Sequence, residues 1–349
     1  MPATADIPAT PPACLVCGNA AGNRILAARE KMDGTLESFD YVQCAACGHL
    51  HLVALPADLG SYYAKGYYSF HVRPIPVWHR WLYRIRTSAA LGGGNIFGSL
   101  LDRLKPPYYA YWLEKTGLRL GDRVLDVGCG VGNLLRILQV SGLECTGIDP
   151  YLPAESSTPE GARLIRRDLM EEPDTYHAVL FNHSFEHVPN PREVLAQATA
   201  LLDPSGCVVV RIPLADSFAF FRYGPDWVQW DAPRHLNLFT QDSFRRLAEQ
   251  VGLHVEKTIH DSDQMQFWGS EEYRRNVFHN SRASYGHDPR QTRFSKRQLR
   301  TYARWAEWLN EMGAGDQATF ICRAGRRVSD ALPGTTSGPA ATNHENRDP

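Results

Sequence analysis

The residues best suited to chemistry lie in a glycine-rich turn near the middle of the chain. An apolar run over 124–127, interrupted by Asp126, leads into three glycines at alternate positions before a helical pattern begins: Gly128, Gly130 and Gly132. Such glycines let the backbone bend sharply and approach a ligand without side chains in the way. A dinucleotide fingerprint needs a glycine at position 133, where this chain has Asn133, so the turn argues against NAD.

The pattern D-x-G-x-G-x-G after a strand resembles motif I of the class I S-adenosylmethionine (SAM)-dependent methyltransferases. The resemblance continues, because Asp149 ends a second apolar strand and Asp168 follows a third. It implies that Asp126 orients the turn or reaches the cofactor's amino group through water. It also implies that Asp149 holds the ribose hydroxyls, that Asp168 contacts adenine, and that the segment after the fourth strand lines the methyl-transfer pocket. The predicted cofactor-binding residues are Asp126, Gly128, Gly130, Gly132, Asp149, Asp168 and Asn182.

Four residues after the fourth and fifth strands are candidate catalytic groups: His183, Glu186, His187 and His235. Neutral imidazole suits a general base near neutral pH. The Glu186-His187 pair is similar to that of the ubiquinone-biosynthesis O-methyltransferases, where an E-x-x-E-H segment can hold a divalent cation. Here His183 replaces the first glutamate, which weakens a magnesium interpretation. Packing alternatives are a helix N-terminal acid for Glu186, a buried imidazole for His187, and a helix-entry motif for Arg234-His235. Arg234 otherwise suits a substrate carboxylate or phosphate.

Two C-x-x-C-G units near the N-terminus predict a structural zinc site formed by Cys14, Cys17, Cys44 and Cys47. Four thiolates leave no open position for water, so a structural role is expected. A hairpin over 24–42 would fill the spacer between the two units. His49 and His51 are alternative ligands, although solvated or packed histidines are the simpler interpretation.

A zinc ribbon ahead of this domain resembles the zinc-containing sugar C-methyltransferases and methyltransferase-like proteins of glycan and secondary-metabolite pathways. The resemblance implies a small-molecule acceptor, such as a sugar nucleotide or glycan-pathway intermediate, methylated on carbon or oxygen. A quinone or aromatic O-methyltransferase is one alternative. Another is a non-catalytic SAM-binding scaffold whose ribbon recruits a partner.

The elements that must position these residues follow an alternating strand and helix pattern, which predicts a Rossmann-like seven-stranded α/β sheet. Strands are expected over 124–127, 144–148, 162–165, 177–181, 207–212, 253–259 and 318–322, the last antiparallel. Thr240 should cap a helix over 241–250. The predicted organisation is a disordered 1–13, a zinc ribbon over 14–60, an aromatic linker or cap over 61–106, a methyltransferase domain over 107–325 with a helical insertion at 263–315, and a disordered tail over 326–349.

Two aromatic stretches lie between the ribbon and the domain. Tyr62, Tyr63, Tyr67 and Tyr68 suggest either a flap over the ligand or a packed strand. Residues 75–105 are expected to form a helical connector between domains, with an amphipathic membrane-surface helix as the alternative.

Charge and composition narrow the function classes further. The chain has 37 basic and 38 acidic residues among 349 and a net charge of −1, so nucleic acid is not an expected partner. It has no run of 18 apolar residues and no signal-peptide pattern at its N-terminus, which predicts a cytoplasmic protein with reduced thiols and no membrane span. Composition leaves the oligomeric state open.

Overall fold

The computed structural model describes residues 11–63, 75–91, 110–291 and 293–325. Most of the predicted disordered N-terminus and the whole predicted tail over 326–349 lie outside these ranges. Of the predicted linker, residues 64–74, which include Tyr67 and Tyr68, and residues 92–106 also lie outside the described residues.

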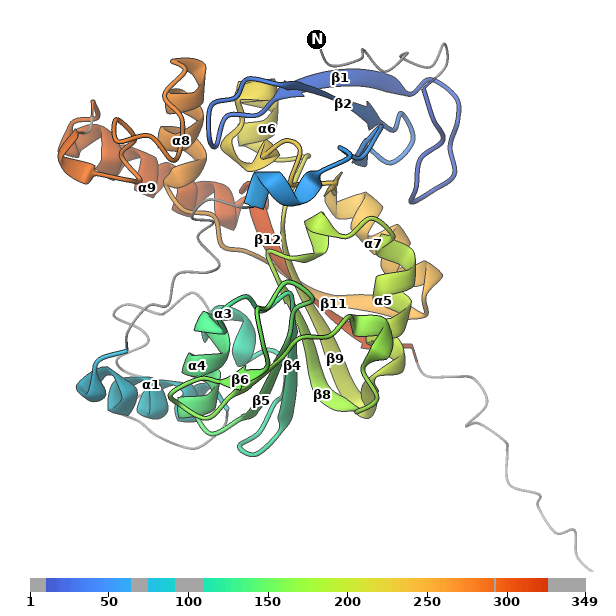
Figure 1. The fold of residues 1–349 in the computed structure, drawn as a ribbon, viewed down its shortest axis with the longest axis vertical. Coiled ribbons are helices and arrows are strands. Elements are labelled where there is room, and N and C mark those ends of the chain that lie inside the picture. Colours follow the sequence, from blue (N-terminus) through green and yellow to red (C-terminus); the bar gives the residue numbers. More distant parts are fainter. Residues whose placement is uncertain (1–10, 64–74, 92–109, 292, 326–349) are drawn as a thin grey trace, which may run out of the picture.

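An eight-stranded sheet forms the centre of the molecule (Figure 1), in the order β11-β12-β9-β8-β4-β5-β7-β6. Its strands are β4 (Arg123–Val127), β5 (Glu144–Ile148), β6 (Ser156–Ser157), β7 (Arg163–Ile165), β8 (Tyr176–Asn182), β9 (Leu202–Pro213), β11 (Leu253–His260) and β12 (Gln317–Ala324). All seven predicted strands are present, and β12 is antiparallel to both neighbours as expected. The eighth, β6, is a two-residue edge strand that carries no apolar alternation to reveal it.

Helices cover both faces of this sheet. On one face lie α1 (Val77–Ala90), α3 (Ala110–Leu113) and α4 (Asn133–Val140), and on the other α5 (Pro191–Ala200) and α7 (Gln241–Gln250) (Figure 1). Thr240 caps α7 in a capping box with Ser243, as its sequence predicts. An ion pair of 2.9 Å between Arg80 and Glu160 attaches α1 to the domain. No helix within the described ranges has the length and apolar character needed to cross a bilayer.

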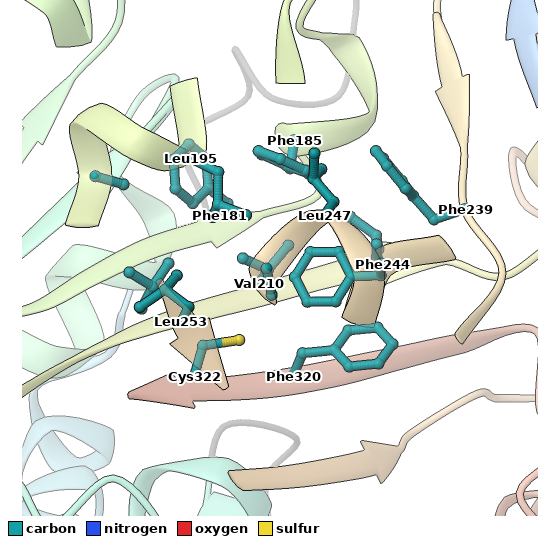
Figure 2. Close-up of a cluster of buried hydrophobic side chains, with 14 of the residues drawn as sticks. Phe181, Phe185, Leu195, Val210, Phe239, Phe244, Leu247, Leu253, Phe320 and Cys322 are labelled. Carbon is teal, nitrogen blue, oxygen red and sulfur yellow. The ribbon is translucent and has the colours of Figure 1, made fainter. Parts of the chain in front are cut away.

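The core beneath α5 and α7 is rich in aromatic rings (Figure 2). Phe244 of α7 lies 4.3 Å from Phe320 of β12, measured between ring centroids, and Phe185 lies 5.5 Å from Phe239. Each buried aromatic ring of this size removes a large apolar surface from water. Because Phe239 follows a strand that pairs with the N-terminal ribbon, this core also fixes the ribbon to the sheet.

The N-terminal ribbon is a separate sheet in the order β1-β2-β3-β10. Its own strands are β1 (Arg24–Arg29), β2 (Ser38–Gln43) and β3 (Leu50–Leu52), while β10 (Asn237–Leu238) comes from the segment after β9. The expected hairpin is the β1–β2 pair. Cys14, Val16, Cys44 and Cys47 join the same buried cluster as Phe239 and Phe244, so the ribbon shares a core with the main sheet.

A helical layer built from α6 (Phe218–Tyr223), α8 (Met265–Arg274) and α9 (Lys296–Glu311) lies beyond one end of the sheet, next to the ribbon (Figure 1). The insertion predicted over 263–315 is helical as expected, because it contains α8 and α9. Short 3-10 helices complete the described elements: η1 (Leu59–Tyr63), η3 (Leu169–Glu171), η4 (Phe185–His187), η5 (Gly224–Asp226), η6 (Val228–Trp230) and η7 (Pro289–Gln291).

Candidate active site

A cavity of about 440 Å³ opens at the carboxyl ends of β4, β5, β7 and β8. The chain leaves β4 for α4 on one face and leaves β8 for α5 on the other, which opens a crevice at the sheet edge between the two strands. One side of the cavity, here termed the glycine wall, consists of Val127, Gly128, Asp149 and Asp168. The other side includes Tyr63, His183, Ser184 and His187.

The turn after β4 needs glycine for steric reasons. The backbone φ is +74° at both Gly128 and Gly132, a left-handed conformation that side chains disfavour. A Cβ atom on Gly128 would lie 2.6 Å from Cβ of Ser184, and one on Gly132 would lie 2.9 Å from Leu164. The glycine turn therefore fits closely between β8 and the β7 side of the cavity.

Asp149 joins the glycine turn to the loop after β5. Its carboxylate accepts the backbone N–H of Gly130 at 3.0 Å and that of Tyr151 at 2.9 Å. An ionised carboxylate accepts about four hydrogen bonds, so it keeps capacity for ligand hydroxyls. Asp126 is buried nearby, and burial together with the charge of Asp149 raises the pKa of its carboxyl to about 8. Asp126 is therefore largely protonated at neutral pH and suited to donating a hydrogen bond.

The predicted cofactor-binding residues do not all reach the cavity surface. Gly128, Asp149 and Asp168 line it, and Asp168 also caps η3 by accepting the N–H of Met170 at 2.9 Å. The other four predicted residues are absent from the cavity lining: Asp126, Gly130, Gly132 and Asn182. The first three shape the turn from behind, and Asn182 ends β8.

The four predicted catalytic residues lie together, and we term them the histidine cluster. Nδ1 of His183 is 3.2 Å from Oε1 of Glu186, and Nε2 of His235 is 3.8 Å from the same oxygen. The rings of His187 and His235 are 4.8 Å apart. His183 and His187 line the cavity, whereas Glu186 and His235 are buried behind them.

Backbone carbonyls determine which nitrogen of two imidazoles carries the hydrogen. Nδ1 of His187 is 2.8 Å from the carbonyl oxygen of Arg234, and Nδ1 of His235 is 2.8 Å from that of Gln229. A carbonyl oxygen only accepts hydrogen bonds, so both Nδ1 atoms are donors. In the neutral rings Nε2 then holds the lone pair, which is the arrangement that a proton acceptor requires.

Burial and neighbouring charges set the protonation of this cluster. Burial lowers the pKa of His187, and the adjacent His235 lowers it further, so His187 is neutral at neutral pH. Burial alone would raise the pKa of Glu186. The hydrogen bond from His183 and the surrounding imidazoles outweigh burial and bring that pKa to about 2. The cluster therefore pairs a permanently ionised carboxylate with a neutral imidazole at the cavity wall.

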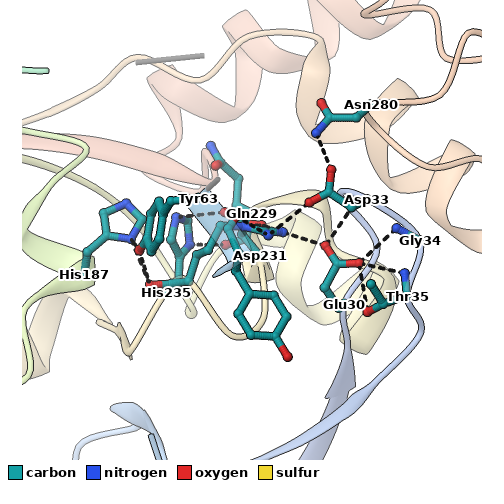
Figure 3. A network of polar contacts seen from close by, with 12 residues as sticks. Glu30, Asp33, Gly34, Thr35, Tyr63, His187, Gln229, Asp231, His235 and Asn280 are labelled. Carbon is teal, nitrogen blue, oxygen red and sulfur yellow. Dashed lines mark hydrogen bonds and ion pairs between the residues drawn. The ribbon is translucent and has the colours of Figure 1, made fainter. Parts of the chain in front are cut away.

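A buried ionic network supports the cluster from the ribbon side (Figure 3). The guanidinium of Arg234 donates to Asp231 at 2.8 Å and to Glu30 at 2.8 Å, and all three residues are buried. Glu30 also accepts backbone N–H groups of the β1–β2 turn, including that of Gly34 at 2.9 Å. The side chain of Arg234 is thus engaged within the protein, while its carbonyl oxygen orients His187.

Two members of this network, Asp231 and Glu30, were not among the residues predicted from the sequence. Asp231 lies three residues before Arg234 in the D-x-P-R-H segment, and that spacing between opposite charges was a usable signal. Glu30 could not be recognised from the sequence, because it lies 204 residues from Arg234 and only the docking of the ribbon brings the two together. Tyr63, one of the predicted tyrosines, lines the cavity with its hydroxyl oxygen 3.2 Å from Nδ1 of His187.

The four predicted metal-ligand cysteines converge in the ribbon, with ligating atoms within 4.8 Å of one another. The sulfurs of Cys14 and Cys47 are 3.6 Å apart, and those of Cys17 and Cys44 are 3.5 Å apart. Four sulfurs at about 2.3 Å from a zinc ion would be separated by about 3.8 Å, so this donor set fits tetrahedral zinc. Glu186, His187 and His235 also have ligating atoms within 4.8 Å of one another.

Comparison with known proteins agrees with this geometry. Residues 100–258 match a family model described as a methyltransferase domain. A ubiquinone biosynthesis O-methyltransferase from Photobacterium profundum is 34% identical over 31% of this chain and 51% of its own length. One from Bordetella bronchiseptica is 33% identical over 40% of this chain and 62% of its own length. The chain therefore spans less than two thirds of these relatives.

Solved structures are less similar. The cyclopropane synthase MmaA2 from Mycobacterium tuberculosis, for example, aligns with a TM-score of 0.39 and 15% identity, over 73% of this chain and 87% of its own. A similarity of this size does not bear on function. The residues matched by the family model include β4 to β10 and most of β11, the part of the chain that forms the glycine wall and the histidine cluster.

Proposed function

We propose that this protein is a SAM-dependent methyltransferase acting on a small-molecule acceptor. One observation carries the proposal. The cavity joins a glycine turn and two strand-end aspartates on one side to a neutral, oriented imidazole on the other. SAM would supply an activated methyl group. The residues of this chain would bind the cofactor, orient the acceptor and remove a proton from it.

In this proposal the glycine wall holds the cofactor. Asp149 accepts ribose hydroxyls with its remaining lone pairs. Asp168 contacts the adenine amino group, as the resemblance to class I methyltransferases implies. Gly128 lets the backbone approach the ligand, because no side chain projects from that point of the wall.

His187 is the proposed base. It lines the cavity, its Nδ1–H is fixed by the carbonyl of Arg234, and its lowered pKa keeps Nε2 free of a proton at neutral pH. His235 and the ionised Glu186 lie behind it, and the negative charge of Glu186 stabilises the imidazolium that forms when His187 accepts a proton. His183 is a second imidazole at the cavity wall.

Two acceptor classes fit a base of this kind. A phenolic or quinol hydroxyl is favoured by the relatives, which are named as ubiquinone biosynthesis O-methyltransferases. A sugar nucleotide or glycan-pathway intermediate rests on the resemblance of the zinc ribbon to sugar C-methyltransferases. We favour the phenolic class as the first to be tested, and the nucleotide sugars as the second.

The first experiment is calorimetric titration of the full chain with S-adenosylhomocysteine, with NAD as the control ligand. We expect micromolar binding of the former and none of the latter. Asp149→Ala should weaken binding about tenfold to a hundredfold, since a charged hydrogen-bonding group is lost. Asp174→Ala, an exposed acid outside the cavity, should not. A folded protein that fails to bind S-adenosylhomocysteine would contradict the proposal.

The second experiment tests the base. His187→Gln should lower methyl transfer about a hundredfold to ten-thousandfold while leaving S-adenosylhomocysteine affinity unchanged. A panel of catechols and quinols, followed by nucleoside-diphosphate sugars, identifies the acceptor class. Metal analysis of the same preparation should give one zinc per chain, held by the four cysteines. A second equivalent of metal that is lost in His235→Gln would assign an ion to Glu186, His187 and His235.

A further inference from the structure

Five large apolar side chains of the helical layer are exposed, and none of them lines the cavity. Their exposed fractions range from 42% for Phe218 to 74% for Phe221. We term them the apolar face: Phe218 and Phe221 of α6, and Trp305, Trp308 and Met312 of α9 and its C-terminal turn. Single exposed apolar residues are ordinary, but a group of this size on two adjacent helices marks an interaction surface.

The two helices that carry this face are in contact. The backbone N–H of Phe218 donates to the carbonyl of Ala314 just beyond α9, at 3.0 Å. The ring of Phe267 lies 6.4 Å from that of Phe218 and 5.8 Å from that of Trp305, so it bridges the two helices from below. An adjacent side of α9 is already buried through Ala306 and Leu309. The exposed side of α9 is therefore not the one that holds it to the domain.

The charges on α9 are arranged against its own dipole. Its first half carries Lys296, Arg297, Arg300 and Arg304, and its second half carries Glu307 and Glu311. A helix dipole favours acids at the N-terminus and bases at the C-terminus, and α9 has neither an acid in its first turn nor a base in its last. Within the described ranges, no ion pair forms at Arg300, Arg304, Glu307 or Glu311.

We propose that the apolar face is the interface of a symmetric dimer, in which α9 packs antiparallel against α9 of a second copy. The proposed contact uses residues 297, 304, 308 and 311, which are seven, four and three positions apart. Such intervals place side chains on one side of a helix, here together with Trp305 and Met312. A two-fold axis near residues 307 and 308 sets the tryptophans at the centre. Arg304 of one copy then faces Glu311 of the other, twice by symmetry.

A second copy fits this surface better than an unrelated ligand because one helix supplies both halves of the charge pattern. An antiparallel partner brings its Glu311 to Arg304 and its Arg304 to Glu311, so opposite charges meet at both ends of the overlap between the two helices. The exposed parts of the five side chains offer roughly 500 Å². A stable interface needs about 800 Å² per partner, and the flanking charged side chains supply the remainder.

Sedimentation velocity of the full chain over a range of concentrations tests the proposal. We expect a species of twice the 39.2 kDa chain mass at tens of micromolar. Trp308→Arg should weaken the dimer about thirtyfold or more, since tryptophans at the centre of an interface carry much of its affinity. Trp81→Arg changes a tryptophan of α1 that is more exposed than Trp308, and it should leave the dimer intact.

Charge reversal provides a second test that does not depend on how well Trp308→Arg folds. Arg304→Glu and Glu311→Arg should each weaken the dimer, and the double variant should restore it, because the facing pair is then exchanged rather than lost. A monomeric wild-type chain would overturn the proposal. So would a dimer that Trp308→Arg leaves unchanged, or a double variant weaker than both single variants. S-adenosylhomocysteine binding should be unaffected throughout, which separates this proposal from the proposed function.

Discussion

The glycine wall and the histidine cluster lie on two sides of one cavity and are assembled differently. The glycine wall is built from strand ends and the turns that directly follow them, and backbone groups such as the N–H of Gly130 hold it in place. The histidine cluster needs the η4 turn, the 231–235 segment and, through Glu30, the N-terminal ribbon. The glycine wall therefore depends mainly on local backbone geometry, whereas the histidine cluster depends on contacts between distant segments.

This contrast predicts that the supporting network of the histidine cluster is the most sensitive part of the molecule. Arg234→Met leaves the buried carboxylates of Asp231 and Glu30 without their cation. We expect a loss of about 3–5 kcal/mol in the free energy of unfolding, measured by urea denaturation. Arg246→Met removes an exposed pair with Asp242 and should leave the midpoint unchanged. Equal shifts of the unfolding midpoint in the two variants would contradict this difference between the two sides of the cavity.

Removal of the metal from the four cysteines should affect the two sides of the cavity differently. The ribbon positions β3 against β10, and β10 directly follows the segment that orients His187. We expect chelation to lower methyl transfer about a hundredfold, as a displacement of about 1 Å can do, while S-adenosylhomocysteine affinity falls less than tenfold. Added zinc should restore activity. If affinity and activity fell together, the glycine wall would also depend on the ribbon.

The same distinction explains what the sequence predicted. The seven strands, the α7 cap and the glycine turn follow from local apolar patterns and backbone requirements, and all are present in the structure. The convergence of the four cysteines also followed from local spacing. The pairing of Glu30 with Arg234, and of β10 with β3, depends on how distant segments dock. No local propensity encodes such docking, so neither pairing was predicted.

The acid limb of the pH dependence of methyl transfer should report the histidine cluster. Burial and His235 lower the pKa of His187 below its ordinary value near 6.5, and a protonated imidazole cannot accept a proton. The value of kcat/KM should therefore fall about tenfold per pH unit as the pH drops from neutrality through that lowered pKa. His187→Gln should remove this inflection. S-adenosylhomocysteine affinity should not follow the same profile, and a shared profile would place the titrating group on the glycine wall.

The smallest effect is expected from Gly128→Ala, which adds a single methyl group to the glycine wall. Gly128 and Gly161 both have positive φ, at +74° and +99°, so alanine at either position should cost about 1–2 kcal/mol of stability. At Gly161 nothing lies within 4 Å of the added carbon, whereas at Gly128 it meets Ser184 at 2.6 Å. Gly161→Ala should therefore leave S-adenosylhomocysteine affinity unchanged in calorimetry, and Gly128→Ala should weaken it by displacing Ser184 at the cavity surface. Equal affinities for the two variants would mean that the wall adapts, and that its close fit between β4 and β8 is not what binds the ligand.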